Sequence, residues 1–156
     1  MQLNGIAHIY LTVNNFAACL PFYEKLLTFF EMECLVKTDV LFYCVGSRTG
    51  IGIRKAKPEY GDVPYDQGRP GVHHLCFRAR SREDVDKIYE FLQESGARIV
   101  HVPQEDNQWA PGYYSVLFED PDGTRLEVNY VPGKGNLDPA IKLPLADDVQ
   151  ARLSEW

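Results

Sequence analysis

The sequence predicts an α+β fold made of two βαβββ modules that form a curved mixed sheet. Two observations carry this prediction: an internal repeat, and the same order of one strand, one helix and three strands in each copy. The segment Ile6–Val13 matches Val72–Ala79 with an offset of 74 − 8 = 66 residues. Both segments alternate apolar residues with other residue types, which is the period of a strand covered on one face.

The first module is predicted over residues 1–57. Asn14 and Asn15 follow its first strand and are residue types that favour a helix N-terminus. Apolar residues at helical spacing indicate the helix, and Pro21 is expected to kink it or to delay its regular start. Three strands are predicted after the helix, over Glu33–Lys37, Leu41–Val45 and Ile51–Lys55.

The second module is predicted over residues 71–132, after a linker at 58–70 that is rich in Pro, Gly, Asp and Tyr. Ser81, with Asp84 three residues later, forms a variant of the capping box, and the helix is expected to run to about Ser95. Three strands follow in the prediction, over Arg98–Val102, Tyr113–Glu119 and Arg125–Val131. Residues 133–156 form a tail whose prolines limit it to short helical pieces.

The composition excludes several classes of protein. With 156 residues, 45% of them hydrophobic and 24% charged, the chain has the composition of a globular protein rather than a disordered one. The formal net charge of -6 provides no basic footprint for a nucleic acid or an anionic membrane. No apolar run is long enough for a membrane span, and the first residues lack the layout of a signal peptide, so a cytoplasmic location is expected. The four cysteines show no C-x-x-C spacing and are expected to be buried free thiols.

Two histidines and a glutamate are the candidate functional residues. His8 and His74 occupy equivalent positions of the repeat, on the strand face opposite the apolar residues. In the last strand, Leu126 and Val128 are expected under the helix, so Glu127 projects to the same side as the histidines. Two imidazoles and one carboxylate are ligands for a divalent metal with open coordination positions, and the set suits Fe, Mn, Co, Ni or Zn.

These residues carry a resemblance to a known family. The chain is similar to members of the vicinal oxygen chelate superfamily, the glyoxalase, bleomycin resistance and dioxygenase group. The similar segments are His8–Val13, Phe22–Tyr23, His74–Phe77 and Asp120–Glu127. The resemblance implies paired βαβββ modules around a cleft that binds a divalent metal, with the two histidines and Glu127 as the metal ligands.

The resemblance also implies a class of reaction. Family members use the metal to bind two neighbouring oxygens of a substrate, so we expect a dioxygenase or a glyoxalase-like lyase or isomerase acting on a small oxygen-rich molecule. Glyoxalase I-type isomerases add a fourth ligand from the first module, but the alignment puts Gly52 there. The acid–base tyrosine of extradiol dioxygenases also has no counterpart, because Leu117 stands at its position. The alternative is a metal-free small-molecule binding protein of the bleomycin-resistance type.

Three further residues are candidates for catalysis or substrate binding. Arg54 lies two residues beyond Gly52 and is expected either to bind an anionic oxygen or to form a surface salt bridge. Asn129, together with Arg125, is expected to hold the glutamate ligand in position. Tyr114 is a candidate proton donor or wall of the substrate site, with core packing as the alternative. A homodimer is expected, as is common in the family.

Overall fold

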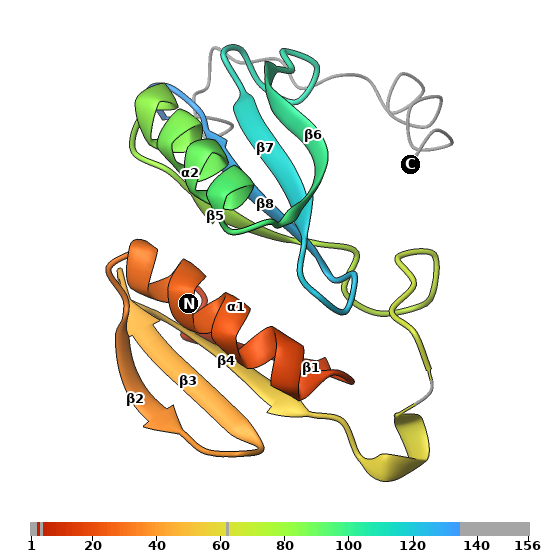
Figure 1. Cartoon of the computed structure of the whole chain (residues 1–156). Helices are drawn as coiled ribbons and strands as arrows, with labels where there is room; N and C mark the ends of the chain where they lie inside the picture. The colour runs from red at the N-terminus through yellow and green to blue at the C-terminus, as the bar shows by residue number, and fades with distance from the viewer. Residues whose placement is uncertain (1–2, 4, 62, 135–156) are drawn as a thin grey trace. The chain divides into compact units, whose positions relative to one another are not determined.

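The computed structural model describes residues 3, 5–61 and 63–134, which group into two compact units (Figure 1). Of the described residues, unit 1 contains those up to Pro70 together with Asp120–Thr124, and unit 2 contains Gly71–Glu119 and those from Arg125 to Lys134. Each unit holds one βαβββ module with its own four-stranded sheet. Short helical pieces were expected in the tail at 133–156, and all of it beyond residue 134 lies outside the described residues.

Unit 1 forms a mixed sheet that is covered on one face by a helix. Its elements are β1 (His8–Val13), α1 (Phe16–Phe29), β2 (Glu33–Lys37), β3 (Leu41–Gly46), β4 (Thr49–Lys55) and the 3-10 turn η1 (Pro58–Tyr60). The strand order is β1-β4-β3-β2, in which β1 and β4 are parallel and the other neighbours are antiparallel. Figure 1 shows α1 lying along one face of this sheet.

The core of unit 1 lies between α1 and the sheet. In β1, Leu11 and Val13 are buried, whereas His8, Tyr10 and Thr12 are exposed, which confirms the alternation predicted from the sequence. The other large buried side chains of this unit are Phe16, Tyr23, Leu26, Leu27, Phe42, Ile51 and Ile53. The opposite face of the sheet therefore carries the side chains that are available for function.

Helix α1 begins directly after Asn15, whose side chain accepts a hydrogen bond from the Ala18 amide at 3.1 Å. The expectation that Pro21 delays the regular start is wrong, because the helix begins at Phe16 and continues through the proline. A proline lacks one amide hydrogen and removes one helical hydrogen bond. The burial of Tyr23 and its apolar neighbours against the sheet offsets that loss. No helix in the described part of the chain is long and apolar enough to cross a membrane.

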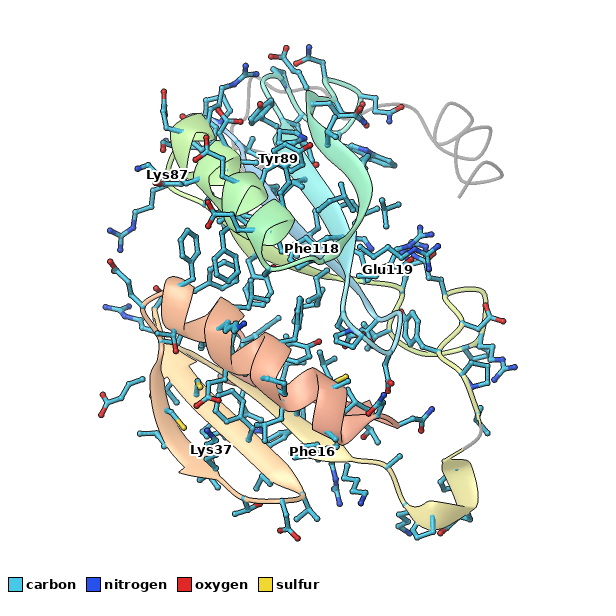
Figure 2. All side chains as sticks on the ribbon, in the orientation of Figure 1. Phe16, Lys37, Lys87, Tyr89, Phe118 and Glu119 are labelled. Carbon is cyan, nitrogen blue, oxygen red and sulfur yellow. The ribbon has the colours of Figure 1, made fainter. Side chains whose placement is uncertain are left out.

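Unit 2 repeats this architecture. Its elements are β5 (Leu75–Arg78), α2 (Arg82–Glu94), β6 (Arg98–Glu105), β7 (Tyr114–Glu119) and β8 (Arg125–Tyr130), in the sheet order β5-β8-β7-β6. Ser81 caps α2 by accepting a hydrogen bond from the Asp84 amide at 3.1 Å, as predicted. The helix buries Val85 and Leu92, and Phe118 of β7 is buried in the same unit (Figure 2).

The two sheets share the same register as well as the same strand order. Tyr10 of β1 pairs with Gly52 of β4, and Cys76 of β5 pairs with Glu127 of β8. Tyr10 and Cys76 are separated by 76 − 10 = 66 residues, the offset of the sequence repeat. The structure therefore confirms that Gly52 stands at the position equivalent to Glu127.

The turn between β7 and β8 belongs to unit 1. Asp120 closes the turn, because its Oδ1 accepts hydrogen bonds from the amides of Asp122 and Thr124 at 2.9 and 2.8 Å. Its Oδ2 accepts the hydroxyl of Tyr23 at 2.8 Å, and both groups are buried. The Asp122 carboxylate accepts the backbone amides of Asn14 and Asn15 at the N-terminus of α1. The Asp120–Thr124 signature is thus a structural element of the first unit.

Candidate metal centre

His74 and Glu127 come together in unit 2. His74 immediately precedes β5, and Glu127 lies in β8, the strand that pairs with β5. The His74 Nε2 atom lies 3.3 Å from Glu127 Oε2, with the two side chains 28% and 7% exposed. A parallel strand pair therefore places an imidazole beside a buried carboxylate, and these are two of the three metal ligands that the sequence predicts.

Hydrogen bonds keep Glu127 ionised. The Tyr113 hydroxyl donates to Glu127 Oε1 at 2.7 Å, and the Ser115 side chain also forms a hydrogen bond with the carboxylate. Burial alone would raise the pKa of Glu127, but the hydrogen bonds from His74, Tyr113 and Ser115 outweigh burial and hold that pKa below its usual value. One carboxylate oxygen is held by Tyr113, while the other faces the imidazole.

The tyrosine whose hydroxyl reaches Glu127 is Tyr113, whereas the candidate Tyr114 has other contacts. The Tyr114 hydroxyl donates to Asp86 Oδ1 of α2 at 2.7 Å, and the Arg82 guanidinium lies 4.6 Å from the centre of the Tyr114 ring. Tyr114 therefore packs against the helix and is not brought to the carboxylate. Strand alternation identifies Tyr113 from the sequence. Leu117 of β7 is the register partner of Glu127, and Tyr113, four residues earlier along the same extended segment, lies on the same face.

The two residues expected to support Glu127 differ in their contacts. The Asn129 side chain forms a hydrogen bond with Tyr113, so it acts on Glu127 through that tyrosine. Arg125 is directed instead to Glu119, with its Nε atom 3.3 Å from Glu119 Oε1. The Arg98 guanidinium also pairs with this carboxylate, with its Nη1 atom 2.8 Å from Glu119 Oε2. Glu119 is labelled in Figure 2.

His73 contacts His74 directly. Their Nδ1 atoms are 2.8 Å apart, and the rings meet edge to face at a centroid distance of 5.1 Å. Burial, followed by the neighbouring charges of His74 and Arg125, lowers the pKa of His73 and keeps its ring neutral at pH 7. In the tautomer that binds a metal, Nδ1 of His74 would carry the proton and donate to His73, and Nε2, which in this structure donates to Glu127, would offer its lone pair to the ion. This contact between neighbouring histidines was not predicted from the sequence.

The remaining predicted residues lie in unit 1. His8 is the first residue of β1, is exposed, and meets the Tyr10 ring edge-on at a centroid distance of 5.6 Å. Arg54 is exposed near the end of β4, in register with Thr12 of β1. The predicted ligands are therefore distributed over both units, with His8 in unit 1.

The cysteines are free thiols, but only some of them are buried. Cys19 and Cys44 are buried, whereas Cys34 and Cys76 are exposed, so the expectation of burial is wrong for the latter two. Cys76 is the register partner of Glu127. Although Cys76 as a residue is exposed, its sulfur is in contact with the Glu127 carboxylate. Desolvation of the sulfur, followed by the Glu127 charge, raises the pKa of the thiol, which therefore stays protonated at neutral pH.

Comparisons with known proteins identify the family. The family model of the Glyoxalase/Bleomycin resistance protein/Dioxygenase superfamily matches residues 5–128. The chain belongs to this superfamily. It is 28% identical over 128 residues to the metallothiol transferase FosB of Shouchella clausii, covering 82% of this chain and 81% of FosB. It is 33% identical to the uncharacterized protein YqjT of Bacillus subtilis over 76 residues, which are 49% of this chain and 59% of YqjT, less than two thirds of that relative.

Solved structures of the superfamily show the same fold. A glyoxylase/bleomycin resistance protein/dioxygenase domain from Frankia sp. EAN1pec superposes with a TM-score of 0.66 at 27% identity. The match covers 83% of this chain and 98% of the Frankia domain. The two βαβββ modules are therefore the expected superfamily fold.

The residues in unit 2 fit part of a superfamily metal centre. An imidazole nitrogen and an ionised carboxylate are ligand types that zinc, iron, manganese, cobalt and nickel accept. Tyr113 and His73 hold these two side chains by their far atoms, which is the usual arrangement around metal ligands. Within the described residues, no group of three or more His, Cys, Asp or Glu side chains is already gathered to hold an ion.

Proposed function

We propose that this chain is a metal-dependent enzyme of the glyoxalase/dioxygenase type that acts on a small oxygen-rich substrate. His8, His74 and Glu127 are the proposed ligands of a divalent ion, which is Fe, Mn, Co, Ni or Zn. The observation that carries the proposal is the pairing of His74 with a buried, ionised Glu127 at 3.3 Å. Burying a carboxylate is costly, and a protein retains such a group when a cation or hydrogen-bond donors compensate it.

The surrounding residues have separate roles in this proposal. Tyr113 fixes Glu127 through Oε1 and directs Oε2 toward His74, and Asn129 holds Tyr113. His73 fixes the orientation of the His74 ring. The metal, when bound, supplies positive charge that stabilises negative charge on the substrate oxygens. Arg54 is the proposed contact for an anionic group of the substrate.

The reaction class follows from the residues that are absent as well as those present. Gly52 supplies neither a fourth ligand nor a base, which disfavours an isomerase that uses a first-module acid. The relationship to FosB adds thiol transfer to the dioxygenase and lyase reactions to be screened. We further propose a cytoplasmic homodimer, in keeping with the expectations from the sequence.

Metal content of the purified protein tests the proposal. Glu127→Gln keeps the shape of the side chain but removes its charge, and we expect it to lower the metal-to-protein ratio about tenfold or more in elemental analysis. Glu119→Gln is the matched control, since Glu119 is a similarly buried carboxylate of the same sheet that pairs with Arg98 and Arg125. The control is expected to retain the wild-type ratio.

The opposite result would favour the metal-free binding protein. A wild-type chain that contains no metal after growth with each candidate ion, and Glu127→Gln protein with unchanged ligand affinity, would contradict the proposal. His74→Ala compared with His101→Ala provides a second test, because His101 is a histidine of β6 in the same unit with its Nδ1 directed to the Val102 carbonyl. Only His74→Ala is expected to lose metal.

A further inference from the structure

The β4 strand of unit 1 has side chains on only one face along much of its length. Ile51 and Ile53 are buried in the core. Gly50 precedes Ile51, and Gly52 lies between the two isoleucines. Glycine in a strand interior weakens the strand, and it often marks a place where a ligand or another chain segment approaches the backbone closely. Two glycines at alternate positions therefore need an explanation.

Two tyrosine rings occupy the space above these glycines. A Cβ atom added to Gly52 would overlap the Tyr10 ring, and one added to Gly50 would overlap the Tyr43 hydroxyl. Tyr10 comes from β1 and Tyr43 from β3, the two strands on either side of β4. The rings are nearly parallel, with an interplanar angle of 11° and a centroid distance of 5.4 Å. The glycines thus allow both rings to lie against the sheet.

This tyrosine pair is accessible and lies beside polar groups. Tyr10 is 45% exposed, and the His8 ring meets it edge-on. Arg54 is on the same face of β4, two residues beyond Gly52, which corresponds to about 7 Å along the strand. Within the described residues Arg54 forms no ion pair, so its charge is available to an anion there.

We infer that Tyr10 and Tyr43 form a platform that binds the flat ring of a small aromatic anion, with the anionic group directed to Arg54. Aromatic rings stack on one another in parallel-offset geometry, and the tyrosine pair already has this geometry. The guanidinium of Arg54 matches a carboxylate or phosphate group in charge and shape. The inference rests on the proposed function, because it names the substrate class for the site to which His8 is assigned.

Binding of simple probes to metal-free protein tests the inference. After dialysis against a chelator, 2-naphthoate is expected to bind about tenfold more tightly than its saturated analogue decahydro-2-naphthoate, which has the same charge but no flat ring. The dissociation constants are measured by isothermal titration calorimetry. Equal affinity for the two probes would overturn the inference.

Variants separate the ring contact from the charge contact. Tyr10→Leu and Tyr43→Leu are expected to abolish the preference for the flat ring, whereas Tyr10→Phe retains it. Tyr60→Leu is the control, since Tyr60 is exposed in η1 and not part of the pair. Arg54→Gln should weaken the binding of 2-naphthoate but not the binding of the uncharged 2-naphthalenemethanol. Unchanged binding in both leucine variants would contradict the platform.

A readout on the wild-type protein covers the case in which a variant does not fold. In amide NMR spectra, 2-naphthoate is expected to shift the signals of Gly50 and Gly52, the residues beneath the rings. Shifts confined to other residues, or a platform variant that changes only the oligomeric state, would overturn the inference. Because these measurements use metal-free protein, a chain that never takes up metal can still show the preference for 2-naphthoate, so failure of the metal proposal and failure of the platform give different results.

Discussion

The two modules have the same fold and register but differ at one equivalent position. In unit 2 the position is Glu127, a buried ionised carboxylate beside His74, and in unit 1 it is Gly52, which is covered by the Tyr10 ring. Neither residue disturbs the sheet, because both lie on the face opposite the helix. The comparison shows that the sheet specifies the fold, while this face can carry either a buried carboxylate or an aromatic ring.

The modules also differ in how their helices are stabilised. The N-terminus of α2 is capped by the neighbouring residue Ser81. The N-terminus of α1 is capped by its neighbour Asn15 and also by Asp122, in a turn more than 100 residues away. The turn also holds Tyr23 through Asp120. Tyr89 is the repeat equivalent of Tyr23 in α2 and is only half-buried (Figure 2).

The largest difference is expected between Tyr23→Phe and Tyr89→Phe. Tyr23→Phe removes a buried hydrogen bond to the Asp120 carboxylate, which is expected to cost about 1.5–3 kcal/mol of unfolding free energy. Tyr89 forms no hydrogen bond with the residues the structure describes, so Tyr89→Phe should change stability by less than about 0.5 kcal/mol. Urea unfolding of the three proteins measures both effects. Equal destabilisation by the two variants would show that the hydrogen bond from Tyr23 to Asp120 does not distinguish the two modules.

The repeat made the fold and part of the site predictable from the sequence. Period-2 alternation and the 66-residue offset predicted which face of β1 and β5 is covered. Matching the last strand of each module, at an offset of 127 − 52 = 75 residues, aligned Gly52 with Glu127. These features are local or periodic, so they are visible in a single sequence. The contact of Asp122 with the amides at the start of α1 could not be predicted in this way, because no local or periodic pattern links a turn to a helix so far away in the chain.

Two other residues show where the sequence reasoning stopped short. Tyr113 was not among the predicted site residues, although strand alternation puts it on the same face as Leu117, the register partner of Glu127. The contact between His73 and His74 was missed for a different reason. His73 precedes β5, where the backbone is not extended strand and the alternation rule no longer applies.

Gly52→Ala is expected to give the next largest effect. The added Cβ overlaps the Tyr10 ring, and overpacking costs about 1–3 kcal/mol, partly offset by about 0.4–1 kcal/mol from the less flexible unfolded chain. We expect a net loss of about 1–2 kcal/mol in urea unfolding. Gly61→Ala is the control, since Gly61 has an ordinary helical φ and a Cβ there meets only the Pro58 carbonyl at 3.4 Å. A Gly52→Ala protein as stable as the Gly61→Ala protein would show that the ring is not seated on the glycine.

Asp122→Ala should have a smaller effect on the first helix. It removes the acceptor for the amides of Asn14 and Asn15, while the Asn15 side chain continues to cap Ala18, so a loss of about 1 kcal/mol is expected. Asp122→Asn keeps an acceptor oxygen and is expected to lose less. Ser81→Ala provides the comparison for α2, with a similar cost of about 1 kcal/mol from its single local cap. Thermal and urea unfolding measure these changes, and an Asp122→Ala protein equal to wild type would show that the distant cap contributes nothing.

The smallest effect concerns the pH dependence that Asp120 gives to the first unit. Burial raises the pKa of Asp120 above its ordinary value, although hydrogen bonds from Tyr23, Thr124 and Asp122 oppose the rise. At pH values between the unfolded and the folded pKa of Asp120, the folded state therefore binds more protons than the unfolded state. The contribution of Asp120 to stability falls as pH rises through this range. Asp120→Asn cannot titrate, so the stability of the wild type relative to this variant should decline as pH rises above about 4, the ordinary pKa of an aspartate. Urea unfolding of both proteins at several pH values measures the difference. A relative stability that instead increases with pH would mean that the hydrogen bonds outweigh burial at this carboxylate, as they do at Glu127.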